Sequence, residues 1–504
     1  MTLRPWIIVA FVTLGIPASA ASAAPPNVVL IYADDLGYGD VSVNGARAGL
    51  TPHVDRLARE GLRFTDAHAT SATCTPSRYG LMTGEYPWRR QGTGVLPGDA
   101  KLIIEPGRTT LASVFRDAGY RTMAVGKWHL GLGSGDLDWN GRIAPGPLEI
   151  GFDECFVMAA TGDRVPCVYV KDHEVVNRDP ADPIVVRYDA AIPGEPTGRA
   201  NPERLRLHPS HGHDMAIVDG VSRIGFMKGG EKARWTDEAM ADTFTAQAVE
   251  FIRRNRDRPF FLYLATHDVH VPRLPAARFL GKSGMGPRGD AIAEFDWTVG
   301  EVLRALDDTG LAASTMVVLT SDNGPVVDDG YRDQAVEKLG GHRPAGPFRG
   351  GKYSKFEGGT RMPFIVRWPG RVQPGTSPAL VCQVDFVASF AALVGRAGTI
   401  ATALDSRDHL RALLGEDAKG RETLIEQAGG LAVRRGRWKF IPASSGARIL
   451  ANTATETGNA PAPQLYDLDA DPGETRNVAA EHPDLVEQLR RDLAEARGEP
   501  HRSK

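Results

Sequence analysis

The chain has no large excess of charge of either sign. Its 504 residues include 59 lysines and arginines and 62 aspartates and glutamates, which gives a formal net charge of −3. Proteins that bind nucleic acids or membrane surfaces in general carry a strong positive charge. The balance therefore argues against both classes, and any binding of anions must come from a local cluster of residues.

Long apolar runs are missing after the N-terminus, so no later segment is expected to span a membrane. The N-terminus combines Arg4, a short apolar core over 6–16 and small residues at 18–23, the three parts of an export signal. No cysteine follows the core, which argues against a lipoprotein. We expect 1–23 to be a signal peptide that is read by the export machinery and cleaved. The mature protein would be periplasmic or secreted, with no membrane contact; an uncleaved anchor is the alternative.

Cysteines are few: Cys74, Cys155, Cys167 and Cys382. Cys155 and Cys167 are close enough in sequence to close a small disulfide in an oxidising compartment. Two unpaired thiols are the alternative, and the sequence leaves both open.

Cys74 stands out by its neighbours, because it opens the run Cys74-Thr75-Pro76-Ser77-Arg78. Proline at the first helical position costs no hydrogen bond, so the run predicts a helix that starts near Pro76. Cys74 would lie just before that helix, where backbone N–H groups stabilise an anion. Arg78, one turn on, can point back to the same group. A buried structural cysteine is the alternative.

Internal repeats and low-complexity tracts are also missing, and short apolar runs alternate with amphipathic segments, which predicts an α/β fold. Continuous apolar runs suit a mostly parallel sheet covered on both faces, whose sites lie beyond the carboxyl ends of the strands. We therefore expect the polar residues after four runs to meet in one cleft. The runs are 28–32 before Asp34 and Asp35, 122–125 before Lys127 and His129, 260–264 before His267 and His270, and 316–319 before Asp322 and Asn323.

Four of these residues, Asp34, Asp35, Asp322 and Asn323, offer only oxygen ligands. Hard divalent cations take such sets, whereas zinc would normally show histidine or cysteine. A helix cap or a solvated turn is the alternative for the aspartate pair. The residues predict a site for Ca²⁺ or Mg²⁺ without choosing between the two ions.

The run at 74–78, followed by Gly80-Leu81-Met82-Thr83-Gly84, resembles the maturation signature of type I, formylglycine-dependent sulfatases, arylsulfatase-like members included. The resemblance extends from about Pro26 to the C-terminus, where 465–468 and 471–474 look like the family's closing stretch. It implies the alkaline phosphatase superfamily fold. That fold is a large, mostly parallel sheet flanked by helices, here over 25–400, with a smaller C-terminal subdomain at 401–504 that contains a short antiparallel sheet.

The resemblance also implies a cofactor and a maturation partner. Cys74 would be oxidised to formylglycine by a formylglycine-generating enzyme. Asp34, Asp35, Asp322, Asn323 and the modified Cys74 would hold one Ca²⁺.

The same resemblance gives catalytic roles to the cationic and protonatable residues. Lys127 and Lys352 would bind the sulfate oxygens while one hydroxyl of the hydrated aldehyde attacks sulfur. His270, with or without Lys352, would protonate the leaving alcohol. His129 would take the proton from the second hydroxyl so that sulfate is expelled. His270 is preferred to His267 because the family's contacting histidine lies two residues before a proline, here Pro272.

The expected reaction is hydrolysis of a sulfate ester, with a sulfated carbohydrate or a small sulfate ester as partner and no nucleic acid. A phosphonate monoester hydrolase or phosphodiesterase is one alternative, and a non-catalytic glycan-binding relative is another. Two segments, 161–164 and 208–214, are candidates for substrate contact, although the second could bind a second metal instead. Trp235 could stack on a sugar or lie in the core. The substrate-binding candidates are His267, Asp163, Arg164, His211 and His213.

Overall fold

The computed structural model of the chain describes residues 2, 25–46 and 49–498, and the structural statements below concern these residues. The expected signal peptide lies outside them except for Thr2. A ten-stranded sheet forms the centre, in the order β15-β2-β14-β13-β1-β12-β4-β5-β6-β7. Its five middle strands are parallel, and antiparallel pairs flank them, so the expected mostly parallel sheet is confirmed. The middle strands are β13 (Thr315–Ser321), β1 (Asn27–Ala33), β12 (Phe260–Ala265), β4 (Arg121–Lys127) and β5 (Glu154–Met158).

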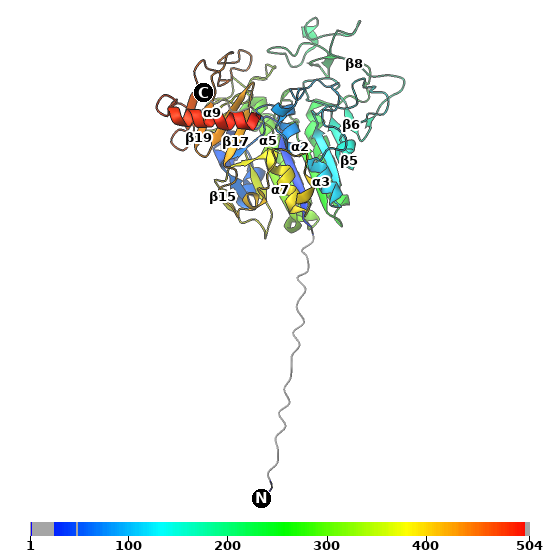
Figure 1. The fold of residues 1–504 in the computed structure, drawn as a ribbon. Coiled ribbons are helices and arrows are strands. Elements are labelled where there is room, and N and C mark those ends of the chain that lie inside the picture. The colour runs from blue at the N-terminus through cyan, green and yellow to red at the C-terminus, as the bar shows by residue number, and fades with distance from the viewer. Residues whose placement is uncertain (1, 3–24, 47–48, 499–504) are drawn as a thin grey trace.

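Two groups of helices cover the two faces of this sheet (Figure 1). The first group is α1 (Pro52–Arg59), α4 (Met240–Arg254) and α5 (Gly286–Asp308), which pack on one another. The second is α2 (Cys74–Thr83), α3 (Leu111–Asp117) and α7 (Phe386–Leu393). Both α3 and α4 contact β4 and β12, and they belong to the two different groups of helices.

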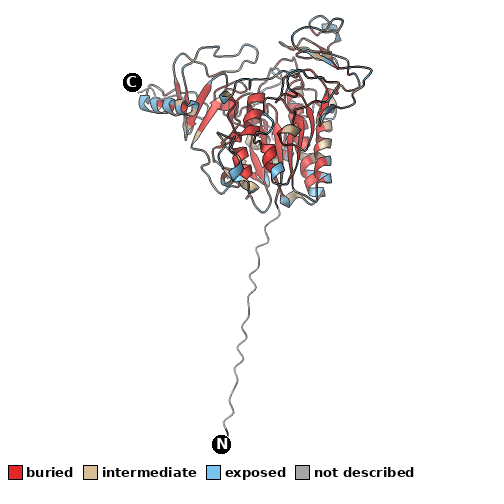
Figure 2. Cartoon of the chain, turned by 45° about the vertical axis from the view of Figure 1, so that its right-hand side comes forward, coloured by how far each residue is buried: buried red, intermediate tan, exposed pale blue. Residues whose placement is uncertain are grey.

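The middle strands are apolar along their whole length because both faces are covered. Every residue of β1, β12 and β13 is buried, as Figure 2 shows in red for the centre of the molecule. Full burial of one valine, leucine or isoleucine side chain contributes about 1.5–3 kcal/mol. The parallel strands therefore form a rigid base, and the segments that leave their carboxyl ends are held in fixed positions.

A four-stranded antiparallel sheet forms the C-terminal part, as expected. Its strands are β17 (Thr423–Gln427), β18 (Leu431–Arg435), β19 (Trp438–Ile441) and β20 (Gln464–Asp467). Helix α9 (Pro483–Arg497) packs on this sheet and buries the leucines at positions 489 and 493. A division of the chain near residue 400 stays a prediction.

The remaining elements are short. They are β2 (Leu62–Phe64), β3 (Ala67–His68), β6 (Tyr169–Lys171), β7 (Glu174–Val175), β8 (Val185–Arg187), β9 (Ile217–Val218), β10 (Val221–Ser222), β11 (Phe226–Lys228), α6 (Glu357–Thr360), β14 (Ile365–Arg367), β15 (Gly375–Ser377), β16 (Val381–Cys382) and α8 (Leu410–Leu413).

Two open questions from the sequence are answered by the fold. Cys155 and Cys167 are free, buried thiols, so the disulfide alternative is wrong. Trp235 is buried beside Tyr169, with ring centroids 5.6 Å apart, so it belongs to the core rather than to a sugar-stacking surface. Within the described residues, no helix has the length and apolar content needed to cross a membrane.

Candidate active site

The four predicted strand ends lie side by side, because β13, β1, β12 and β4 are consecutive in the sheet. The polar residues that follow them gather at one edge, where a mostly parallel sheet places its sites. Asp34, Asp35, Cys74 and His270 each offer a ligand atom, and these four atoms lie within 4.8 Å of one another. All four side chains are buried. The sheet thus assembles one acidic centre with a thiol at its side.

Cys74 is the first residue of α2, with Thr73 as its N-cap, rather than the residue before the helix. Pro76 is therefore the third helical residue, still in the first turn, where N–H groups have no partner inside the helix. The Cys74 thiol lies 3.9 Å from Asp34 Oδ1. Burial raises the pKa of Cys74 to about 12, so this thiol is not an ionised nucleophile at neutral pH.

The glycine in the motif allows close packing of α2. A Cβ atom on Gly80 would lie 2.4 Å from Thr70 Oγ1, which already donates to Ser77 O at 3.0 Å. Any larger residue at position 80 would push the helix away from the segment before Cys74.

The sequence led us to expect that Arg78 points back to the Cys74 side chain. The hydrogen bonds of its guanidinium go to other groups instead. Its Nε and Nη2 donate to Asp322 Oδ2 at 3.1 and 2.8 Å, and its Nη1 donates to Lys127 O at 3.0 Å. The planar guanidinium suits a carboxylate better than the small group on Cys74. Arg78 thus fixes Asp322, one of the expected metal ligands.

Asp34, Asp35, Asp322 and Asn323 surround the acidic centre. Asn323 donates from Nδ2 to Asp35 Oδ1 at 2.6 Å, whereas its buried Oδ1 has no hydrogen-bond partner. Burial and the neighbouring Asp322 raise the pKa of Asp34 well above its usual range. Crowded carboxylates beside an orphaned amide oxygen are the donor set that a hard cation requires. The residues therefore fit a divalent metal ion.

Two buried ammonium groups lie against these carboxylates. Lys127 pairs with Asp34, and its Nζ is 3.9 Å from Asp322 Oδ2. Lys352 donates to Asp35 Oδ2 at 2.9 Å and to Asp329 Oδ2 at 2.7 Å. Although burial opposes it, these two carboxylates raise the pKa of Lys352 well above its usual value. Lys352 therefore stays charged at the centre.

His270 and His129 each have one ring nitrogen held by a backbone carbonyl. His270 Nδ1 lies 2.7 Å from Val271 O, so Nε2 is left facing the centre, 3.8 Å from Asp35 Oδ2. His129 Nε2 lies 2.9 Å from Leu96 O, and its buried Nδ1 has no partner. Burial and Lys127 lower the pKa of His129 well below 6.5, while burial, Lys352 and Lys127 do the same for His270.

His267 lies beside His270, and the centroids of the two rings are 6.0 Å apart. Its Nε2 is 3.5 Å from Pro272 O, and burial lowers its pKa to about 4. A Cβ atom on Gly162 would lie 2.5 Å from the His267 ring, so the 161–164 segment packs directly on this histidine.

The candidate substrate segments meet at Asp163. Arg164 Nη1 donates to Asp163 at 2.9 Å, and His213 Nε2 is 2.9 Å from Asp163 Oδ2. The His211 ring is held by Ser210, with Nδ1 3.0 Å from Ser210 Oγ, and the His211 carbonyl oxygen lies 2.8 Å from His213 Nδ1. No group of three metal-type side chains occurs at 208–214 in the described part of the chain, so the second-metal alternative has no support.

Asp329 belongs to the centre but was not among the residues selected from the sequence. It accepts from Lys352 and lies 4.0 Å from His270 Nε2. The only signal was its place six residues after Asn323, in the segment that follows a predicted strand end. Irregular backbone carries no periodicity, so its direction could not be inferred.

Comparisons with known proteins agree with this geometry. The family model for sulfatases matches residues 26–396. An N-acetylgalactosamine-6-O-sulfatase of Bacteroides thetaiotaomicron is 52% identical over 92% of this chain and 91% of its own length. Human arylsulfatase A is 34% identical over 95% of this chain and 89% of its own length. A structure solved in work on the metabolism of multiple glycosaminoglycans by B. thetaiotaomicron superposes with a TM-score of 0.93 at 51% identity, covering 94% of this chain and all of that one. The chain therefore belongs to the sulfatase family and is a sulfuric ester hydrolase.

Proposed function

We propose that this enzyme removes the 6-O-sulfate from N-acetylgalactosamine units of a sulfated glycan. One observation carries the proposal: 52% identity, over nine-tenths of both chains, to a bacterial N-acetylgalactosamine-6-O-sulfatase. Mammalian N-acetylgalactosamine-6-sulfatases are less similar, at 28% for the dog and 29% for the mouse enzyme. The choice of sugar thus rests on the bacterial relative, whereas sulfate ester hydrolysis rests on the whole family.

We infer that the acidic centre holds Ca²⁺ and that Cys74 is converted to formylglycine by a maturation enzyme. The orphaned Asn323 Oδ1 and the crowded carboxylates of Asp34, Asp35 and Asp322 support the metal. A bound Ca²⁺ would offset negative charge on the sulfate oxygens. The aldehyde made from Cys74 would supply, in its hydrated form, a hydroxyl nucleophile that a buried thiol does not.

The side chains of this chain then bind sulfate and move two protons. Lys127 and Lys352 hold the sulfate oxygens and oppose the charge that builds in the transition state. His270 Nε2 faces the centre and gives its proton to the leaving alcohol. Burial and two lysines disfavour the protonated form of His270 in the free enzyme, and the bound sulfate anion favours it.

His129 suits the opposite role, because its Nε2 is held by Leu96 O and its Nδ1 is free to accept a proton. A lowered pKa keeps this imidazole neutral, as a general base must be. Asp163, Arg164 and His213, fixed to one another beside His267, would hold sugar hydroxyls at the mouth of the site.

A sulfate-release assay tests the proposed substrate. The enzyme is made in a host that co-expresses a formylglycine-generating enzyme, and the tryptic peptide that ends at Arg78 is first checked by mass for the aldehyde. Sulfate release is then compared for the 6-sulfates of N-acetylgalactosamine and N-acetylglucosamine and for N-acetylgalactosamine 4-sulfate. We expect the highest kcat/KM on the first sugar. An equal or higher value on either other sugar contradicts the proposal.

We also infer export to the periplasm or the medium, from the charge, apolar core and small residues of 1–23. N-terminal sequencing of the protein from the periplasmic and secreted fractions tests this. A new N-terminus between residues 18 and 25 is expected, and a full-length cytoplasmic protein contradicts it.

A further inference from the structure

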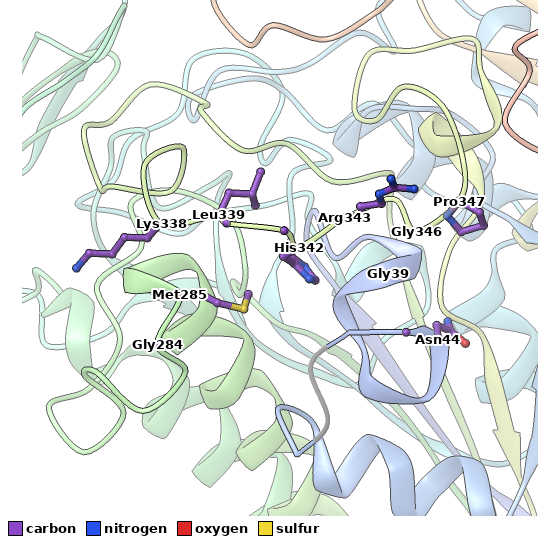
Figure 3. A pocket seen from close by; sticks show the side chains of 13 residues that line it. Gly39, Asn44, Gly284, Met285, Lys338, Leu339, His342, Arg343, Gly346 and Pro347 are labelled. Carbon is purple, nitrogen blue, oxygen red and sulfur yellow. The ribbon is translucent and has the colours of Figure 1, made fainter.

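A hollow of about 630 Å³ lies beside the segment that follows the acidic centre (Figure 3). Gly39 lines it and donates from its N–H to Pro344 O at 2.7 Å. Gly39 is four residues beyond Asp35, so the two Cα atoms lie within about 14 Å even for a fully extended chain. A few sugar units span such a distance.

The lining of this hollow favours an anion. Its 13 lining residues include no aspartate or glutamate, although the chain as a whole carries a net charge of −3. Lys338 and Arg343 flank it on two sides in Figure 3, and both are exposed. Neither side chain has a hydrogen bond or ion pair with any described residue. Their charges are therefore available to a ligand.

One lining residue of the hollow, His342, contacts a buried carboxylate, that of Asp40. Asp40 accepts from both terminal nitrogens of Arg288 at 2.8 and 2.7 Å, and it lies 2.7 Å from His342 Nε2. The His342 side chain is only 7% exposed, and its ring lies between the two flanking cations in Figure 3. Asp40 occupies Nε2, so this ring atom is not free for a ligand. The Asp40–Arg288 pair fixes this ring in place.

The start of α5 also favours a negatively charged ligand in this hollow. Gly284 and Met285 line the hollow, and Met285 is the N-cap of this 23-residue helix with no side-chain cap. The first N–H groups of a helix and its dipole attract negative charge. Two cations and a helix N-terminus thus border one space.

A second hollow, of about 520 Å³, shares His342, Arg343, Gly346 and Pro347 with the first. It runs along Gly350 and Gly351, the two residues before Lys352. Its only acidic side chain, Glu456, is already bonded to Arg349. The two hollows adjoin at the shared residues of 342–347, and together they are called the groove below.

From these observations we propose that the groove binds a further anionic unit, a sulfate or carboxylate, of the same glycosaminoglycan chain whose terminal sugar occupies the active site. The inference rests on the proposed function for its choice of glycan. Charge complementarity indicates that the ligand of the groove is a polyanion. An uncharged sugar would gain no binding free energy from the unpaired charges of Lys338 and Arg343. The enzyme would then prefer sulfated oligosaccharides to the free sulfated sugar.

The test compares Lys338→Ala/Arg343→Ala with a matched control, Arg253→Ala/Lys419→Ala. The control removes two exposed cations that lie outside both hollows and likewise have no side-chain partner among the described residues. Substrates are N-acetylgalactosamine 6-sulfate and chondroitin 6-sulfate oligosaccharides. For the groove variant we expect about a tenfold higher KM on the oligosaccharides at low salt, an unchanged kcat, and no change on the monosaccharide. High salt should reduce the difference.

A second measurement separates this inference from the proposed function. A chondroitin 6-sulfate hexasaccharide is titrated calorimetrically into Cys74→Ala and into Cys74→Ala/Lys338→Ala/Arg343→Ala. Weaker binding by the second protein supports the groove even if the wild type desulfates no N-acetylgalactosamine ester. Equal binding, or equal oligosaccharide KM values for the groove variant and its control, overturns the inference. If the wild type is inactive on the 6-sulfates, the proposed function fails, and the titration still decides the role of the groove.

Discussion

Replacement of Lys439 by methionine tests how the C-terminal sheet is joined to the catalytic part. Lys439 lies on β19 and is fully buried. Its Nζ is 2.8 Å from Glu426, 3.0 Å from Glu357 and 3.5 Å from Glu474. Glu357 begins α6, five residues after Lys352, and its N–H donates to Glu474 at 2.6 Å. One ammonium therefore holds three carboxylates from both parts of the molecule.

The size of the effect of Lys439→Met on stability follows from the cost of leaving buried carboxylates without a partner. Removing one member of a buried ion pair usually costs about 3–5 kcal/mol, and methionine fills most of the lysine volume, so little of this cost comes from a cavity. We expect Lys439→Met to lower the free energy of unfolding by that amount at pH 8. An exposed strand lysine, Lys228, serves as control, because Lys228→Met should cost less than about 0.5 kcal/mol.

The loss of unfolding free energy caused by Lys439→Met should become smaller as the pH falls. Without Lys439 the folded-state pKa values of the carboxyls rise above their unfolded value of about 4.3. A raised carboxyl pKa gives stability that is present below the unfolded pKa and is lost as the pH rises through the folded pKa. Burial already raises the pKa of Glu474 to about 8 in the wild type. Urea unfolding at pH 5 and pH 8 measures both values, and an equal loss at the two pH values refutes the reasoning.

Four further predictions concern the active site. Cys74→Ser should release no more than one equivalent of sulfate, because a serine ester has no second hydroxyl to expel it; continued turnover contradicts this. EDTA should lower the melting temperature and Ca²⁺ restore it, and Asn323→Ala should need about tenfold more Ca²⁺; an unchanged requirement contradicts the ligand role. Asp329→Asn should lower the pKa of Lys352 and move the alkaline limb of kcat/KM to lower pH; an unmoved limb contradicts it. His267 has a folded pKa of about 4 against about 6.5 unfolded, so wild-type stability falls by up to about 3 kcal/mol from pH 6.5 to 4, and His267→Gln should flatten this fall in urea unfolding.

The strand-end residues could be predicted from the sequence because a single rule relates them. Asp34, Lys127, His270 and Asp322 each follow a buried run, and the carboxyl ends of neighbouring parallel strands share one edge. Neither the order of the strands nor their pairing was needed for this step. The rule places residues at an edge and does not orient their side chains.

Orientation is where the sequence was insufficient. Arg78 lies one helical turn from Cys74, yet its partner is Asp322, 244 positions away in the chain. Lys439 likewise gathers carboxylates that are far apart in the sequence. Such contacts depend on the packing of whole elements, so local spacing cannot reveal them.

The charge balance of the acidic centre connects the metal with the substrate. Four carboxylates and three cations converge there, and the two histidines that face them are kept neutral by their lowered pKa values. With all of these carboxylates ionised, as metal binding would require, the centre alone carries one net negative charge, which would repel an anionic ester. A divalent cation changes the sum to one positive charge, which matches a sulfate monoester with its single negative charge. A phosphate monoester, which is largely doubly charged at neutral pH, would leave an uncompensated buried charge, and this cost favours sulfate. The carboxylates are those of Asp34, Asp35, Asp322 and Asp329, and the cations are Lys127, Lys352 and Arg78.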